Sequence, residues 1–278
     1  MIIDGVLNVA HYDLEPEILA YEPCGAVKGT KLMATLMYKG TCSFACKYCL
    51  WHTLGYHDLP SVNIDEVVSY IQGEGLPDHI LPVEKVESFL VSGMEPTQFD
   101  TLIPMLEAVR ETGVAIRLDT NGTNPDVLAE LFDKKLLDYV AMDVKAPPAK
   151  YELVTQKKVD IKKIEQSIKL VKENAPMYKF RTTACRELLT IQDILEIADW
   201  LGEVHAYEVK DVWDSPKIIG GKGQYHPLED KAGLMKSMDA RASRHVDLKG
   251  NTKELSKDKR AIGEVHFPEP RKGLGIGG

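Results

Sequence analysis

Three cysteines, Cys42, Cys46 and Cys49, have the residue type and the spacing that most directly suggest chemistry. They form a C-x3-C-x2-C triplet, and the 278-residue chain has only two other cysteines. Three thiolates this close can bind three irons of a [4Fe–4S] cube and leave the fourth iron without a protein ligand. An electron-transfer ferredoxin would close that position with a fourth cysteine, so an open iron predicts a site of reaction.

A zinc site is the main alternative for the triplet. His52 stands three residues after Cys49 and could complete a C-x3-C-x2-C-x2-H set. Small zinc sites usually have two C-x2-C pairs, or one C-x2-C pair followed by H-x3-H, and the C-x3-C-x2-C-x2-H set matches neither, so we favour the iron–sulfur interpretation. Cys24 and Cys185 stand apart from the motif, and we expect both to be small buried apolar residues.

The elements that must position the triplet alternate between strand-like and helix-like patterns along the chain. Short apolar runs predict six buried strands: Leu32–Tyr38, Val86–Ser92, Val114–Asp119, Tyr139–Val144, Tyr178–Thr183 and Val204–Val209. Amphipathic helical patterns lie between them. Six such β/α units predict an α/β fold with a parallel sheet, curled into a partial TIM barrel, (β/α)6, with helices outside.

Polar residues gather where these predicted strands end. The cysteines follow the first strand, Glu95 follows the second, and Asp119 and Asn121 end the third. Asp143 and Lys145 end the fourth. Active sites of such barrels lie at the C-terminal ends of the strands, so we expect these residues to form one site.

The chain divides by composition into three parts. We expect a lead-in over residues 1–29, the (β/α)6 core over 30–213, and an irregular Gly/Lys-rich extension over 214–278. Residues 1–210 carry 21 Lys and Arg against 32 Asp and Glu, whereas residues 211–278 carry 13 against 10. An acidic body argues against nucleic-acid binding.

The compartment follows from apolar runs and cysteine usage. No apolar run is long enough to span a bilayer, and the N-terminus has no signal-peptide pattern. Five cysteines, three of them in one motif, favour thiols kept reduced over a disulfide framework. We therefore expect a cytoplasmic protein without a membrane partner.

The triplet, with Tyr48 before its third cysteine, resembles the motif of the radical SAM superfamily. Ser92-Gly93-Met94-Glu95-Pro96 is similar to the Gly-Gly-Glu-Pro segment of that superfamily, with Met94 in place of the second Gly. The resemblance implies that the open iron binds the amino and carboxylate groups of S-adenosylmethionine (SAM). It also implies that Tyr48 lies beside the adenine and that Gly93 and Glu95 shape the site of the amino group.

Two further segments resemble the branch that activates glycyl radical enzymes, in particular the anaerobic ribonucleoside-triphosphate reductase activating proteins. They are Asp119-Thr120-Asn121-Gly122 and Asp143-Val144-Lys145. In that branch the two Asp help to hold a Na⁺ or K⁺ ion near the SAM carboxylate, so the resemblance implies this role for Asp119 and Asp143. Leu50-Trp51-His52 departs from the His-Asn that usually follows the third cysteine.

Several of these side chains also have simpler interpretations. Asp119 could be a turn-forming residue before Asn-Gly, and Lys145 could be a solvated charge. Arg181, on the fifth predicted strand, points to the same end of the barrel. It could pair with the SAM carboxylate or form an ion pair with a neighbouring Asp.

The resemblance implies an anaerobic oxidoreductase. One electron from a flavodoxin- or ferredoxin-type donor would cleave SAM to methionine and a 5′-deoxyadenosyl radical. That radical would take a hydrogen from a glycine of a partner, the glycyl radical enzyme. The alternatives are a radical SAM enzyme acting on a small molecule or modified nucleotide, and a metal-stabilised binding module without catalysis.

Overall fold

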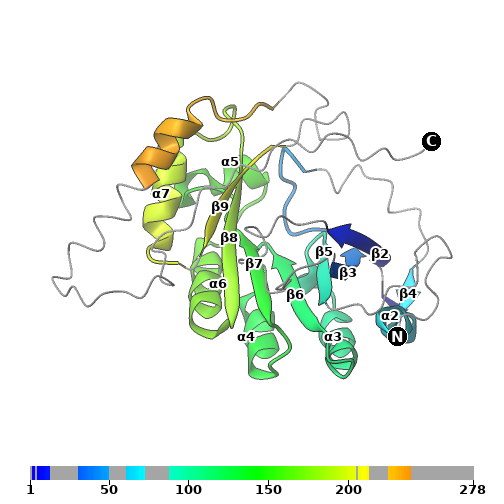
Figure 1. Ribbon diagram of the computed structural model, residues 1–278. Coiled ribbons are helices and arrows are strands. Elements are labelled where there is room, and N and C mark those ends of the chain that lie inside the picture. Colours follow the sequence, from blue (N-terminus) through cyan, green and yellow to red (C-terminus); the bar gives the residue numbers. More distant parts are fainter. Residues whose placement is uncertain are drawn as a thin grey trace, which may run out of the picture.

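The computed structural model describes residues 2–3, 5–12, 31–49, 61–72, 88–204, 206–212 and 225–238. Seven strands form its main sheet, in the order β2-β3-β5-β6-β7-β8-β9, and Figure 1 shows them side by side in this succession. From β3 onward all neighbours are parallel. The strands are β2 (Gly5–Tyr12), β3 (Lys31–Tyr38), β5 (Ser88–Gly93), β6 (Ala115–Thr120), β7 (Tyr139–Asp143), β8 (Met177–Ala184) and β9 (Tyr207–Asp211).

The α/β class and the six parallel strands of the partial barrel are confirmed. Strand ends differ from the predicted ones by at most three residues, as is usual where hydrogen bonding frays at strand ends. Val86 and Glu87 of the second predicted strand lie outside the described residues.

The predicted lead-in contains structure that the β/α pattern did not indicate. Strand β2 pairs antiparallel with β3, from Gly5 opposite Tyr38 to Tyr12 opposite Lys31. A second small sheet joins β1 (Ile2–Ile3) to β4 (Val62–Asn63). The N-terminal segment therefore covers the edge of β3 that the parallel strands leave unpaired, and this protects its backbone groups from other chains.

Helices follow the strands in the predicted alternation. They are α2 (Ile64–Ile71), α3 (Leu102–Arg110), α4 (Pro125–Asp133), α5 (Tyr151–Thr155), α6 (Ile161–Asn174) and α7 (Ile191–Leu201), with short 3-10 turns η2 (Pro96–Gln98) and η3 (Pro148–Lys150). Capping boxes start α2 at Asn63 and α7 at Thr190. Each cap satisfies backbone N–H groups that the first helical turn leaves without a partner.

The core lies between the sheet and these helices. The strand side chains on the face that packs against the helices are fully buried. They include Leu36, Val91, Leu118, Val140, Phe180 and Val209. Burying one such side chain stabilises the fold by about 1.5–3 kcal/mol, so the central strands form a rigid base for the loops at their ends.

Part of the predicted C-terminal extension packs on the core. Residues 231–238 form a helix, and Tyr225, Leu228, Leu234 and Met238 are buried. The Arg186 N–H donates to the His226 carbonyl at 3.0 Å, which ties this stretch to the loop after β8. In the described part of the chain, no helix has the length and apolar character needed to cross a membrane.

Candidate functional site

The cysteine loop follows β3 and is fixed by backbone hydrogen bonds to α5. The Ala45 N–H donates to the Thr155 carbonyl at 2.9 Å, and the Lys47 N–H donates to the Val154 carbonyl at 3.3 Å. Within the loop, the Cys49 N–H donates to the Cys46 carbonyl at 2.9 Å. The loop therefore has a defined turn that carries the three cysteines at the C-terminal end of the sheet.

All three cysteines are free thiols, with Cys46 buried and the other two half-buried. Burial raises the pKa of Cys46 to about 12, and the positive charge of Lys145 opposes that shift. The Phe44 N–H and the Asn121 amide donate to the Cys42 sulfur at 3.4 and 3.6 Å. Donors aimed at a sulfur stabilise its thiolate form, which is the form that binds iron.

The zinc and iron–sulfur interpretations require different arrangements of the cysteine sulfurs. Among them, no group of three or more His, Cys, Asp or Glu side chains is arranged around one ion position. In a cube, by contrast, each thiolate binds a different iron, so the sulfur atoms need not converge on one point. His52, the fourth ligand of the zinc alternative, and Cys24 lie outside the described residues.

Tyr48 is buried, and its hydroxyl has no hydrogen-bond partner among the residues that the structure describes. Buried hydroxyl groups normally have a partner, because leaving one unpaired costs about 1–3 kcal/mol. An unpaired polar atom beside the cysteines is therefore consistent with a site that is completed by a bound molecule.

Glu95 connects the ends of β5 and β6. It is 1 % exposed, and its Oε1 accepts from the Thr97 N–H at 3.2 Å, from the Thr97 hydroxyl at 2.6 Å and from the Thr120 hydroxyl at 2.7 Å. Its Oε2 accepts from the Asn121 N–H at 2.6 Å. Burial raises the pKa of Glu95, and these hydrogen bonds oppose the shift. The carboxylate thus positions the loop that carries Asn121.

The backbone of another strand lies very close to Gly93, at the end of β5. A close approach at this glycine was expected from the sequence motif. It has a φ of +102°, and a Cβ atom built on it would lie 2.4 Å from the Tyr38 carbonyl oxygen and 2.5 Å from the Tyr38 nitrogen. The group that approaches is the backbone of β3 rather than a ligand. A side chain at this position would push the strand that leads into the cysteine loop.

We therefore expect Gly93→Ala to lower the free energy of unfolding by about 2–4 kcal/mol, from strained backbone plus the clash. Gly113→Ala is the matched control, because Gly113 also has a positive φ, +79°, but nothing lies within 4 Å of its Cβ position. We expect the control to lose about 1 kcal/mol. Urea unfolding of both variants measures the difference, and equal losses would contradict the clash.

A second group of site residues lies at the ends of β6, β7 and β8. Arg181 Nε donates to Asp143 Oδ1 at 2.7 Å, and its Nη1 donates to Asp119 Oδ2 at 2.8 Å. Lys145 Nζ donates to the other Asp143 oxygen at 2.9 Å, and Arg117 Nε donates to the other Asp119 oxygen at 3.0 Å. All four carboxylate oxygens therefore accept a hydrogen bond from a cationic side chain.

Electrostatics hold this group ionised. Burial by itself raises the pKa of Asp119, but Arg117 and Arg181 outweigh it and hold that pKa well below its ordinary value. The pKa of Asp143 is lowered in the same way, because Arg181 and Lys145 outweigh its burial. Of the two sequence interpretations of Arg181, the structure contains the ion pair with neighbouring Asp residues.

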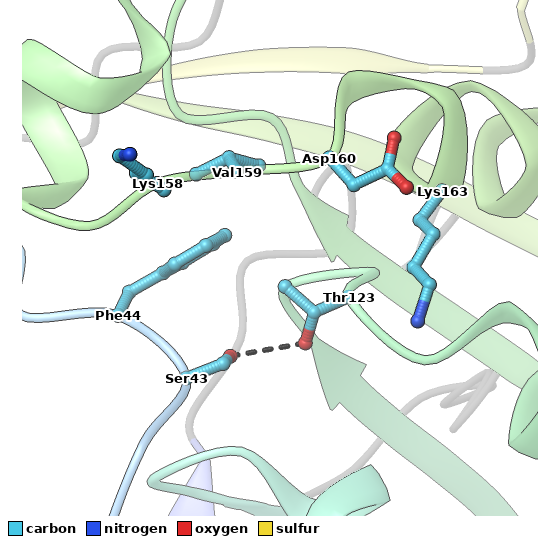
Figure 2. Close-up of a pocket in the computed structure, with 7 residues that line it drawn as sticks. All are labelled: Ser43, Phe44, Thr123, Lys158, Val159, Asp160 and Lys163. Atoms are coloured by element: carbon cyan, nitrogen blue, oxygen red, sulfur yellow. Dashed lines mark hydrogen bonds between the residues drawn. The ribbon is translucent and has the colours of Figure 1, made fainter.

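A pocket of about 330 Å³ opens beside the cysteine loop, as Figure 2 shows. It is lined by Ser43, Phe44, Thr123, Lys158, Val159, Asp160 and Lys163. The Ser43 and Thr123 hydroxyls form a 3.0 Å hydrogen bond at its inner wall (Figure 2). The pocket lies between the two residues that follow Cys42 and the start of α6.

The sequence analysis missed several residues that hold the site together. Arg117 lies two residues before Asp119 on β6, so both side chains are on one face of the strand. That spacing was a usable signal for their ion pair. Thr97 follows Glu95 at the same two-residue spacing, whereas Thr120 gave no such signal, because it is 25 residues away from Glu95 in the sequence.

Comparison with known proteins assigns the family. A model of the radical SAM superfamily matches residues 38–201, more than half of the chain. The chain belongs to the radical SAM superfamily. It is a radical SAM enzyme, and membership implies SAM and a [4Fe–4S] cluster as cofactors.

Relatives of this radical SAM enzyme support the resemblance to the activating branch. Two proteins of Methanocaldococcus jannaschii, each named "Putative glycyl-radical enzyme activating enzyme", are similar to it. One is 29 % identical over 196 residues, which cover 66 % of this chain and 77 % of the relative. The other is 25 % identical over 240 residues, which cover 82 % of this chain and 85 % of the relative.

Solved structures share the fold of this radical SAM enzyme. The enzyme anSMEcpe with bound AdoMet has a TM-score of 0.54 at 17 % identity, with 83 % of this chain and 61 % of that chain covered. SuiB from Streptococcus suis has a TM-score of 0.53 at 13 % identity, with coverages of 82 % and 47 %. This chain therefore spans about half the length of SuiB.

Proposed function

We propose that this radical SAM enzyme activates a glycyl radical enzyme, with Cys42, Cys46 and Cys49 as the ligands of its [4Fe–4S] cluster. The observation that carries the proposal is the cysteine loop at the strand ends, with hydrogen-bond donors aimed at the Cys42 sulfur. When bound, the cluster would pass one electron from a flavodoxin- or ferredoxin-type donor to SAM, which breaks the C5′–S bond and gives methionine and a 5′-deoxyadenosyl radical.

The chain's own residues bind and orient SAM in this proposal. Tyr48 would offer its buried hydroxyl to the adenine, and the backbone at Gly93 would border the amino group. Asn121, fixed by Glu95, orients the cysteine loop through its amide. Arg117, Lys145 and Arg181 outnumber Asp119 and Asp143 by one charge, so this group would favour an anion such as the SAM carboxylate.

In the proposed reaction, the substrate of the 5′-deoxyadenosyl radical is a second protein. The radical takes a hydrogen atom from a glycine Cα, which yields 5′-deoxyadenosine and a glycyl radical stored in the partner. The names of the two Methanocaldococcus relatives support this choice. The pocket between the cysteine loop and α6 offers space beside the triplet for an incoming polypeptide loop. Reduced thiols of this kind suit an anaerobic cytoplasm.

The test is an anaerobic incubation of the reconstituted protein with SAM, dithionite and a glycyl radical enzyme of the same organism. We expect 5′-deoxyadenosine together with the doublet signal of a glycyl radical in electron paramagnetic resonance. A control in which the partner's radical glycine is changed to alanine should give no doublet. Turnover of a small molecule or modified nucleotide, without a protein radical, would overturn the activating function and retain SAM cleavage.

A further inference from the structure

The space between Asp119 and Asp143 is bridged by one planar group. Two carboxylates at adjacent strand ends repel each other unless a positive charge lies between them. Arg181, 7 % exposed, supplies that charge through its Nε and Nη1 groups at 2.7 and 2.8 Å. The fork of an arginine suits this task, because its rigid N–H groups can donate to two acceptors at once.

The charges around this bridge leave little attraction for another cation. Three cationic side chains, Arg117, Lys145 and Arg181, face two carboxylates, which gives the group a net charge of about +1. On β8 and β9, Lys179 and Lys210 both pair with Glu208. These three side chains therefore add no net negative charge that could attract a cation.

The donor set also does not suit an alkali metal ion. Such an ion binds oxygen lone pairs, whereas here N–H groups point at the four carboxylate oxygens. Asp119 and Asp143 therefore do not fit the Na⁺ or K⁺ site that the resemblance implied for them. Their positive partner is already part of the chain.

We propose that Arg181 is a built-in counter-ion, a positioning residue that takes the place of the alkali metal ion and assembles the carboxylate end of the SAM site without Na⁺ or K⁺. The role of Arg181 in SAM binding rests on the proposed function. Its ion pairs with Asp119 and Asp143, however, form in the folded chain alone. They can therefore be measured without SAM, cluster or partner.

The test compares thermal unfolding of the full-length apoprotein in sodium, potassium and tetramethylammonium chloride at equal ionic strength. We expect the same midpoint temperature in the three salts, because no ion binds between the two carboxylates. A saturable rise in midpoint with Na⁺ or K⁺ over tetramethylammonium would overturn the proposal. This wild-type comparison decides the question even if a variant fails to fold.

A variant gives the complementary result. Arg181→Ala leaves the two carboxylates without their bridge, so we expect a lower midpoint in tetramethylammonium chloride and a selective recovery with Na⁺, K⁺ or millimolar guanidinium. The matched control is Arg110→Ala, because Arg110 pairs with Asp138 at the opposite end of β7, at 2.9 Å. An equal response of both variants to these cations would contradict the proposal.

The same salts then serve in the SAM-cleavage assay. We expect the rate of 5′-deoxyadenosine formation by the wild-type enzyme to be the same in all three. If no cleavage is detected under any salt, the proposed function fails, while the unfolding data still test the counter-ion.

Discussion

A Cys46→Ala protein is expected to fold, to lack the absorbance of an iron–sulfur cluster after anaerobic reconstitution, and to release no 5′-deoxyadenosine above the protein-free background. Two thiolates cannot replace the three that an open cube requires. The fold tolerates the change because Cys46 contributes a small side chain, and its backbone carbonyl, which accepts from the Cys49 N–H, remains.

The measurement combines iron and sulfide analysis with chromatography of the SAM reaction mixture. Cys185→Ala is the matched control, because Cys185 is also a buried free thiol but lies after β8, outside the triplet. We expect the control to keep both its iron content and its SAM cleavage. Equal iron loading of Cys46→Ala and wild type would contradict the assignment of the ligands.

The second large effect is expected at Glu95, where replacement by alanine removes the acceptor of four hydrogen bonds. Hydrogen bonds to a charged group contribute about 1.5–3 kcal/mol each, but neighbouring bonds are not additive and the substitution also removes the cost of burying a carboxylate. We therefore expect the free energy of unfolding to fall by about 3–5 kcal/mol. The loop of Asn121 would lose its anchor, and with it the contact to the cysteine loop.

Urea unfolding of Glu95→Ala and of a second variant, Glu95→Gln, separates the contribution of the negative charge of Glu95 from that of its side-chain volume. The glutamine keeps the volume but turns an NH₂ group toward a donor, so we expect it to recover only part of the loss. Glu111→Ala, at an exposed position, should change stability by less than about 0.5 kcal/mol. A Glu95→Ala protein as stable as this control would show that the network contributes nothing.

The sequence predicted those parts of the site that depend on local spacing. The cysteine triplet, Tyr48 and the strand-end carboxylates were recognisable because each belongs to a short motif next to an apolar run. The alternation of runs and helical patterns predicted the parallel sheet for the same reason.

The remaining features depend on distant pairs. Arg181 bridges carboxylates that precede it by 62 and 38 residues, so its partner could not be chosen from the sequence alone. Strand β2 pairs across an intervening segment with β3, and residues 225–238 pack through four apolar side chains in a polar stretch. Tertiary contacts of this kind leave no periodic pattern.

The hydrogen bonds that hold the cysteine loop against α5 and Asn121 have a consequence for the order of events during maturation. They join protein groups to each other and need no iron, so the loop loses its conformational freedom when the chain folds. In zinc fingers, by contrast, metal binding itself drives folding. An iron–sulfur cluster delivered to this chain would bind to a cysteine loop that is already ordered. The free energy of cluster binding would then not be reduced by the entropic cost of ordering the loop.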